Sequence, residues 1–335
     1  MEFRPGIIAL RPLRLGDVYG GVLKSVRGNP GATIGLATLT CLAFLVPTTA
    51  LGAWLSGQSA AGLFDESLAS SDTVPDGFGL GIFGVYLPTI GQSFSAILLA
   101  GFLAQVVGQA VLGRKVGMGE VWRATRGRVL PMVGAVLLIA LLYTVALLLA
   151  IALPVGLIAF SYASDGDSVG LTVLLVVVAV LAAIVVLVWL GTKWSFVTPA
   201  IVLERVGVLR GLRRSWALVG SPLKGAFWRI FGIRLLTGFV VGVAAYIITL
   251  PITLVLFFVT AAFLGEGGDG SEIFVLQTVT TGIAGLITGA LTTPFSAGVD
   301  ALLYVDARIR TEGLDVRLIQ ATQGAAPPPW PTTAP

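Results

Sequence analysis

The sequence predicts an all-α protein, a polytopic bundle of about six transmembrane helices. Of its 335 residues, 56% are hydrophobic and only 11% are charged, whereas soluble domains carry about 25% charged residues. Six apolar runs are each long enough to cross a bilayer, which takes about 20 helical residues. All 21 Lys and Arg residues lie in the two terminal segments and in alternate connections between these runs. We therefore expect lipid to surround most of the chain.

Three regions follow from this pattern. Residues 1–30 form a polar N-terminal segment with an interfacial helix, residues 31–322 form the six-helix transmembrane domain, and residues 323–335 form a tail. The expected spans are 32–55, 82–112, 131–160, 171–190, 235–264 and 273–304. Because several exceed the minimum length, we expect tilt or kinks, and prolines are the natural kink points. These prolines are Pro88, Pro154, Pro251 and Pro294.

The charges fix an expected orientation. Basic residues gather before the first span, in the second and fourth connections, and after the last span, whereas the other three connections carry only acids. These acids are Asp65, Glu66, Asp72, Asp76, Asp165, Asp167, Glu266, Asp269 and Glu272. Basic connections stay in the cytoplasm under the positive-inside rule. We predict a multi-pass protein of the bacterial plasma (inner) membrane with both termini in the cytoplasm.

A short internal repeat subdivides the bundle. Residues 13–19 read LRLGDVY and residues 116–122 read VGMGEVW, while 206–212, VGVLRGL, keep the position but lose the Gly and the acid. Each stretch precedes a pair of spans. We predict three repeats, each an interfacial helix followed by a transmembrane hairpin. Chance resemblance among short basic lead-ins is the alternative.

The stretch 201–219 has the pattern of a basic amphipathic helix. At 100° per residue its apolar side chains share about half of the helical wheel, as in a helix lying at the headgroup level. Its arginines, Arg205, Arg210, Arg213 and Arg214, are the candidate contacts to lipid phosphate or another anion. Positive-inside anchoring is the simpler alternative.

Polar residues within the spans are the other candidates, because each is costly in hydrocarbon. Gln92, Gln105 and Gln109 fall in the second span, the last two on one face. They indicate helix-to-helix hydrogen bonds or, alternatively, a polar substrate path. Near the inner ends of the later spans, a mixed set of charges favours ion pairs that tie these spans together. This set is Lys193, Arg234, Asp300, Asp306 and Arg308.

The sequence argues against several kinds of chemistry. It has no His and one Cys, Cys41, so the commonest general base and metal ligand are both missing. It also has no glycine-rich phosphate loop ending in Lys and Ser or Thr. We expect no metal, no cofactor, no catalytic residues and no nucleic-acid partner. The tail QGAAPPPWPTTAP at 323–335 is uncharged and Pro-rich, so we expect it to be disordered, with a docking peptide as the alternative.

Three stretches carry a family resemblance. They are WSFVTPAIVLERVGVLRGLRRSWALV at 194–219, ALLYVDARIRTEGLDVRL at 301–318 and RPGIIALRPLRLGDVYGG at 4–21. The first two resemble the membrane domain of the glycerophosphoryl diester phosphodiesterase family and its stand-alone bacterial relatives, and the third is similar to actinobacterial members. The resemblance implies a bacterial inner-membrane domain. The catalytic barrel of that family, with its paired histidines, is missing here, so its enzymatic activity is not transferred.

Three functions follow as hypotheses. The first is a non-catalytic membrane protein that binds or helps to move a lipid or other amphipathic envelope molecule, alone or with a partner protein. The second is a scaffold for another integral membrane complex, and the third is a membrane-embedded phosphodiester hydrolase, for which the sequence offers no nucleophile and base. The expected partners are membrane lipids and either a protein partner or a second copy of the chain.

Overall fold

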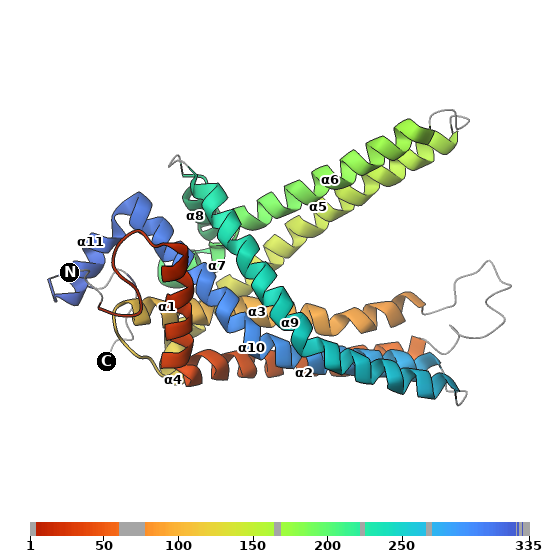
Figure 1. Ribbon diagram of the computed structural model, residues 1–335, viewed down its shortest axis with the longest axis horizontal. Helices are drawn as coiled ribbons and strands as arrows, with labels where there is room; N and C mark the ends of the chain where they lie inside the picture. Colours follow the sequence, from red (N-terminus) through yellow and green to blue (C-terminus); the bar gives the residue numbers. More distant parts are fainter. Residues whose placement is uncertain are drawn as a thin grey trace.

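The computed structural model describes residues 5–59, 78–163, 169–221, 225–265, 270–325, 327 and 330. Within these ranges the chain is helical and contains no strand (Figure 1). The long helices are α2 (Pro30–Ser59), α3 (Phe78–Val111), α5 (Val129–Ala163), α6 (Val169–Lys193), α9 (Ala226–Gly265) and α10 (Gly270–Glu312). The shorter helices are α1 (Leu15–Gly28), α4 (Met118–Thr125), α7 (Val197–Leu203), α8 (Val208–Val219) and α11 (Leu314–Thr322).

The six predicted spans are confirmed as six helices long and apolar enough to cross a membrane. Each contains its predicted apolar run except at the end of α3, which stops one residue earlier. The largest differences are at α9, which begins nine residues before its run, and α10, which continues eight residues beyond its run. Polar residues in these extensions pair with one another, so the helices continue beyond the apolar runs into segments of lower hydropathy.

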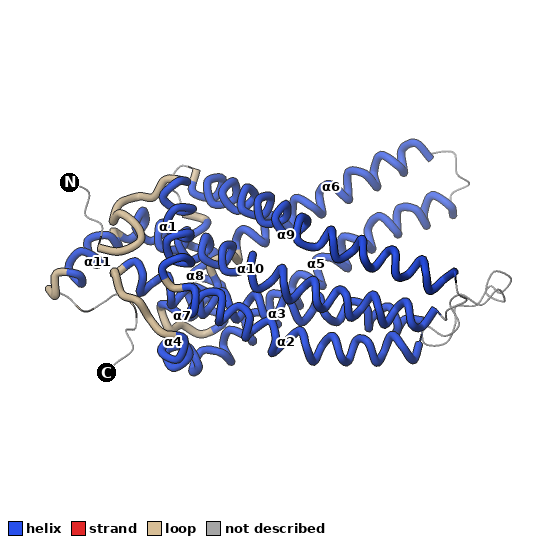
Figure 2. Tube along the Cα trace, turned by 60° about the horizontal axis from the view of Figure 1, so that its bottom comes forward, coloured by secondary structure: helices blue, strands red, loops and turns tan. Residues whose placement is uncertain are grey.

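The long helices form two bodies that diverge. Helices α2, α3 and α10 pack against one another along their lengths, and α9 packs on α10. Helices α5 and α6 form a hairpin that stands away from this bundle, as Figures 1 and 2 both show. Much of the hairpin surface is exposed, as expected for helices that face lipid.

Small residues allow the bundle helices to approach closely. A Cβ atom on Gly52 of α2 would lie 2.4 Å from the carbonyl oxygen of Gly84 in α3, and one on Gly282 of α10 would lie 2.2 Å from Thr49 Oγ1. Such contacts are typical of transmembrane helix packing, in which close backbone approach replaces the hydrophobic effect. Larger residues at these positions would push the bundle apart.

The short helices α1, α4, α8 and α11 gather at one end of the molecule, which we call the basic end (Figures 1 and 2). Their clustering places the predicted basic segments together. The helix ends that flank the three acidic connections lie at the opposite end, which we call the acidic end (Figure 1). Of the acids in these connections, only Glu272 lies within the described residues. The arrangement matches the predicted alternation of loops.

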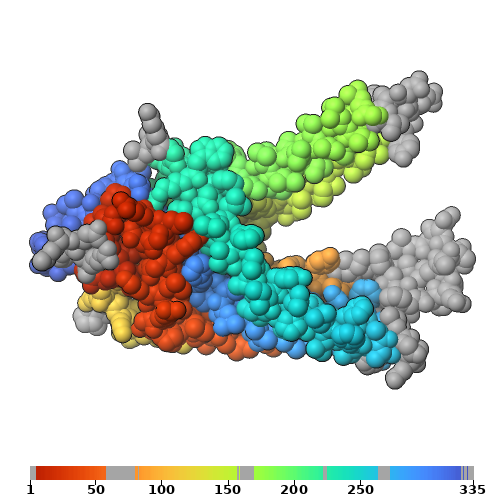
Figure 3. All heavy atoms as spheres, in the orientation of Figure 1, coloured from red at the N-terminus to blue at the C-terminus, as the bar shows by residue number. Residues whose placement is uncertain are grey.

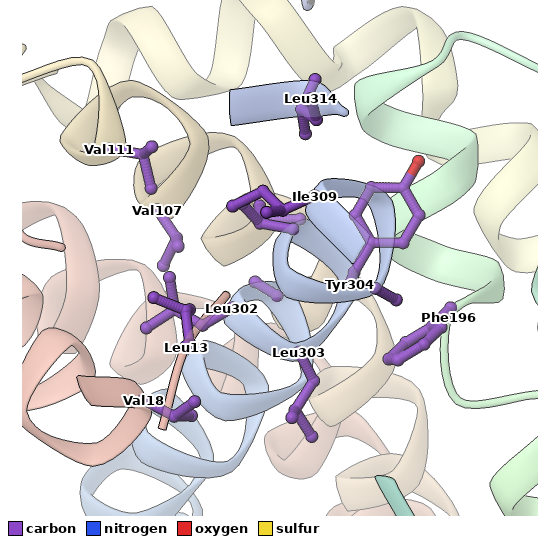
Figure 4. Close-up of a cluster of buried hydrophobic side chains, with 14 of the residues drawn as sticks. Leu13, Val18, Val107, Val111, Phe196, Leu302, Leu303, Tyr304, Ile309 and Leu314 are labelled. Atoms are coloured by element: carbon purple, nitrogen blue, oxygen red, sulfur yellow. The ribbon is translucent and has the colours of Figure 1, made fainter. Parts of the chain in front are cut away.

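An apolar core fills the basic end (Figure 4). Leu13 from the N-terminal segment and Val18 from α1 pack with Val107 of α3 and with Leu302 and Tyr304 of α10. All five are at most 2% exposed. The N-terminal segment is therefore part of the folded core.

The starts of α1, α4 and α8 have the same local geometry. Their N-cap residues, Arg14, Gly117 and Gly207, are extended, with ψ of 167°, 160° and 172°. The backbone N–H of Arg14 donates to Asp17 (3.0 Å) and that of Gly117 donates to Glu120 (3.1 Å), so both acids act as capping residues. The three caps occupy the second position of each predicted repeat stretch. The repeat itself stays a prediction.

The single amphipathic helix expected over 201–219 is wrong. The segment is divided into α7 and α8, with Arg205 between them in the left-handed region at φ 53°. Every residue of α7 except Thr198 is buried, whereas α8 has exposed Leu209 and Trp216. The prediction placed the apolar residues of both helices on a single helical wheel. The left-handed residue between α7 and α8 changes the direction of the chain, so one wheel does not describe both helices. Only α8 suits an interfacial position.

Candidate functional site

A cleft lies where the α5–α6 hairpin diverges from the bundle. Figure 3 shows the hairpin separated from the remaining helices over much of its length. The cavity at the junction has a volume of about 600 Å³, and its lining comes from α3, α5, the α6–α7 region, α9 and α10. A volume of this size is within the usual range for ligand pockets.

The walls of the cleft are mainly apolar. Side chains such as Ile97 of α3, Ile139 of α5 and Ala297 of α10 form most of its surface. Hydroxyl groups also line it, from Ser93, Tyr143, Ser195, Thr198, Thr293 and Ser296. The cleft therefore combines apolar contact area with several polar groups, as expected for a site that accepts an amphipathic molecule.

One ion pair is present in the cleft. Arg234 of α9 donates from Nη1 to Oδ1 of Asp300 in α10 at 3.0 Å, with the side chains 30% and 26% exposed. No other charged residue lines this cavity within the described part of the chain. Arg234 and Asp300 both belong to the mixed charge set from which ion pairs were expected, without assigned partners, and both remain accessible from the cleft.

The turn between α6 and α7 is fixed by Ser215 of α8, which is fully buried. Its hydroxyl donates to the carbonyl oxygen of Lys193 at 2.6 Å and accepts from the backbone N–H of Phe196 at 3.0 Å. On the hairpin, Tyr143 donates to the carbonyl oxygen of Leu187 at 3.3 Å. These contacts hold the basic end of the hairpin, and with it the wall of the cleft formed by Ser195.

Lys193 makes a different contact from the one expected. Among the described residues it has no ion pair, and its ammonium lies 5.8, 5.2 and 6.0 Å from the ring centroids of Trp189, Trp216 and Phe227. Cation–π attraction of this kind stabilises a partly desolvated cation. Lys193 therefore joins α6 to α9, two of the spans it was expected to tie together, and also to α8, but through aromatic rings rather than an ion pair.

The other two members of the mixed charge set form ion pairs at the basic end. Arg308 is 7% exposed and pairs with Glu312 at 3.0 Å and with Glu204 at 3.5 Å. Glu204 also accepts from Arg214 at 2.9 Å, and Arg214 pairs with Glu312. This cluster joins α8 to α10, and its two glutamates were not singled out by the sequence.

Asp306 is the centre of a second buried cluster. It is 1% exposed, accepts from the backbone N–H of Leu13 at 2.7 Å, and pairs with Arg229 and with Arg310. Both arginines also donate to the carbonyl oxygen of Leu13, with Arg310 at 3.0 Å. The cluster thus attaches the N-terminal segment to α9 and α10, a role that hydropathy and charge patterns do not reveal.

The four arginines predicted as lipid contacts separate into two groups. Arg205, Arg210 and Arg213 are exposed. Arg214 is held by Glu204 and Glu312; burial alone would lower its pKa, but the hydrogen bonds and charges of these glutamates raise it. Arg214 is therefore engaged in contacts within the protein. The three exposed arginines remain the candidates for contact with lipid phosphate or another anion.

The three glutamines of α3 lie in the bundle interior or at its edge. Gln92 donates to the carbonyl oxygen of Gly285 in α10 at 3.4 Å, a helix-to-helix hydrogen bond of the predicted kind. Gln105 and Gln109 are each 2% exposed. None of the three glutamines lines the cleft, although Ser93 of the same helix does.

The tail contributes one unexpected residue. Trp330 is 2% exposed and belongs to the basic-end core, next to Gly108 of α3 and Leu203 of α7. It is an exception to the expected disorder of the tail, whose residues 326, 328–329 and 331–335 lie outside the described part. An indole buries a large apolar area, which is the physical reason for its position.

Fold and site together define a class of protein. The chain is a polytopic α-helical membrane protein, and its described residues contain no group of three or more His, Cys, Asp or Glu that could hold a metal ion. A family model described as a domain of unknown function (DUF7847) matches residues 26–306, and the chain belongs to this family. No curated protein and no solved structure matches the chain.

Proposed function

We propose that the protein binds a lipid or a similar amphipathic molecule of the cell envelope in the cleft between the α5–α6 hairpin and the bundle. The observation that carries this proposal is the placement of the Arg234–Asp300 pair in a 600 Å³ cavity whose walls are otherwise mainly apolar. Charged groups at such depth are costly unless paired or in contact with a polar ligand. An acyl chain fits the walls, and a headgroup fits the pair.

In this proposal the basic end faces the cytoplasm and the membrane is the bacterial plasma membrane. The gathering of α1, α4, α8 and α11 at one end supports the orientation through the positive-inside rule. The exposed arginines Arg205, Arg210 and Arg213 then act as anchors at the headgroup level rather than as the binding site. The protein is non-catalytic and uses no cofactor.

The resemblance to the membrane domain of the glycerophosphoryl diester phosphodiesterase family stays a prediction. So does a scaffolding role, in which the exposed faces of α6 and α9 would pack against another integral protein. Burial of Trp330 in its own chain speaks against the tail as a freely available docking peptide. Lipid binding is favoured because the cleft provides both the walls and the polar pair.

Filling the cleft tests the proposal. Ala140 of α5 lines the cleft, whereas Ala152 of the same helix is exposed and lies outside it. Native mass spectrometry of the detergent-purified protein would compare the lipid retained by Ala140→Trp and by Ala152→Trp. We expect loss of retained lipid in Ala140→Trp only. Equal retention in both variants, or no retained lipid in the unmodified protein, would contradict the proposal.

A further inference from the structure

Building on the proposed function, we infer that the cleft selects a headgroup that carries both a phosphodiester and a primary ammonium, as a phosphoethanolamine lipid does. Arg234 and Asp300 are the only charged residues that line the described cleft, so the lining has one positive and one negative group and no net charge. The two groups lie 3.0 Å apart and are both accessible. A ligand with both signs of charge can satisfy both at once.

Arg234 is suited to the phosphodiester. Its guanidinium has five N–H donors in a planar fork, and the hydrogen bond to Asp300 uses one of the two donors of Nη1. The remaining donors match the oxygens of a phosphodiester. Asp300 is suited to the ammonium, because a carboxylate is an acceptor at both oxygens.

Three of the six hydroxyl groups that line the cleft add acceptors rather than donors. Ser93 donates to the carbonyl oxygen of Thr89 at 2.9 Å, Ser195 to that of Thr192 at 2.8 Å, and Ser296 to that of Thr293 at 3.1 Å. Because each hydroxyl hydrogen is used within the protein, what the oxygen offers to a ligand is a lone pair. An ammonium group with three N–H donors is complementary to such a lining.

Two common headgroups fit less well. A phosphoglycerol headgroup brings a net negative charge, which Asp300 repels at close range in a medium of low dielectric constant. A phosphocholine headgroup has both charges, but its quaternary nitrogen has no N–H to donate to Asp300 or to the hydroxyl oxygens. The expected order of binding is phosphoethanolamine, then phosphocholine, then phosphoglycerol.

The position of the pair suits a headgroup that enters from the basic end. Arg234 is eight residues into α9, or about 12 Å from the start of this helix at 1.5 Å per residue. A headgroup drawn to this depth leaves the apolar walls, such as Ile97 and Ile139, for its acyl chains. A water-soluble compound with the same polar groups would lack that contact.

The test is a competition among lipids with identical acyl chains. Delipidated full-length protein in detergent is mixed with equal amounts of phosphatidylethanolamine, phosphatidylcholine and phosphatidylglycerol, and retention is measured by native mass spectrometry. We expect phosphatidylethanolamine to exceed phosphatidylglycerol about tenfold, the effect of roughly one charge-assisted hydrogen bond. Excess glycerophosphoethanolamine should not displace it; displacement would assign the site to a soluble ligand and overturn the lipid assignment.

Two variants test whether Arg234 and Asp300 determine which lipid headgroup is preferred. Asp300→Asn keeps the side-chain shape but leaves Arg234 unopposed, so the preference should shift toward phosphatidylglycerol. Arg234→Gln leaves Asp300 unopposed, and phosphatidylglycerol binding should fall further. If the unmodified protein retains as much phosphatidylglycerol as phosphatidylethanolamine, or more, the inferred headgroup selectivity is overturned but the proposed function is not. If it retains none of the three lipids, the proposed function is overturned as well.

Discussion

Arg234 and Asp300 form their ion pair across the α9–α10 contact and, at the same time, line the cleft beneath the α5–α6 hairpin. The pair thus joins two spanning helices in a cavity. If its role is to hold a ligand as well as to join helices, replacing either residue with its neutral amide should change ligand retention more than thermal stability.

The first prediction compares the effect of Asp300→Asn on thermal stability with its effect on lipid retention. Asp300→Asn should lower the melting temperature in detergent only slightly, because a hydrogen bond from Arg234 remains possible, while changing which lipid is retained. Thermal unfolding followed by circular dichroism, beside the lipid measurements, checks it. A large loss of stability with unchanged lipid selectivity would assign the pair a purely structural role.

The second prediction concerns the buried carboxylate of Asp306. Asp306→Ala should destabilise the protein by about 3 kcal/mol, because it removes the partner of Arg229 and Arg310 and leaves the N–H of Leu13 without its acceptor. Glu272→Ala, which removes an exposed acid from the same helix, is the matched control and should have little effect. Thermal or denaturant unfolding of both variants in detergent measures the difference.

The third prediction concerns Trp330. Trp330→Ala should release the tail from Gly108 and Leu203, so that a protease removes a C-terminal affinity tag faster than from the unmodified protein. The exposed Trp228 provides the control, because its replacement by Ala leaves the basic-end core intact. Equal rates of cleavage in all three proteins would show that the indole does not hold the tail.

The fourth prediction concerns the proposed repeat. Asp17 and Glu120 each accept from the N-cap N–H of their helix, but the equivalent position in α8 is Arg210. Arg210→Asp should therefore create the missing cap and stabilise the protein by about 1 kcal/mol, helped by the helix dipole. Asp17→Ala and Glu120→Ala should each cost a similar amount. Destabilisation by Arg210→Asp would count against structural equivalence of the three segments.

The fifth prediction concerns orientation. The native cysteine, Cys41, is buried, so a single cysteine introduced at an exposed site reports on that site. Arg317→Cys at the basic end should be protected from a membrane-impermeant maleimide in intact spheroplasts, whereas Glu272→Cys at the acidic end should react. The reverse pattern would invert the proposed topology.

The sequence predicted the spans well because a helix in lipid must be apolar for about 20 residues, and no tertiary contact can replace that requirement. Prediction failed outside the apolar runs, where polar residues that pair with one another extend the helices. The extensions of α9 and α10 carry Arg229 and Asp306, which pair with each other. Asp306 was expected to form an ion pair, whereas Arg229 was assigned to a basic connection. The division of 201–219 depends on a left-handed residue, Arg205, that no periodicity reveals.

The candidate site was harder to predict than the spans. Arg234 and Asp300 were expected among a set of charges that form ion pairs, but their partners were not predicted, and the cleft around them depends on how the α5–α6 hairpin is placed. The turn that joins this hairpin to α7 is fixed by the hydrogen bonds of Ser215, which the sequence pattern does not distinguish from other serines. The four arginines of 201–219 attracted attention because they are numerous, although Arg214 is engaged by two glutamates and the other three are exposed.

Lipid binding in the cleft is tested most directly by an experimental structure of the protein in lipid nanodiscs that contain phosphatidylethanolamine. We expect density for one amphipathic molecule in the cleft, with its headgroup within hydrogen-bond distance of Arg234 or Asp300 and its chains along α3 and α5. A cleft filled by protein side chains, or a hairpin closed against the bundle with no ligand between them, would contradict it.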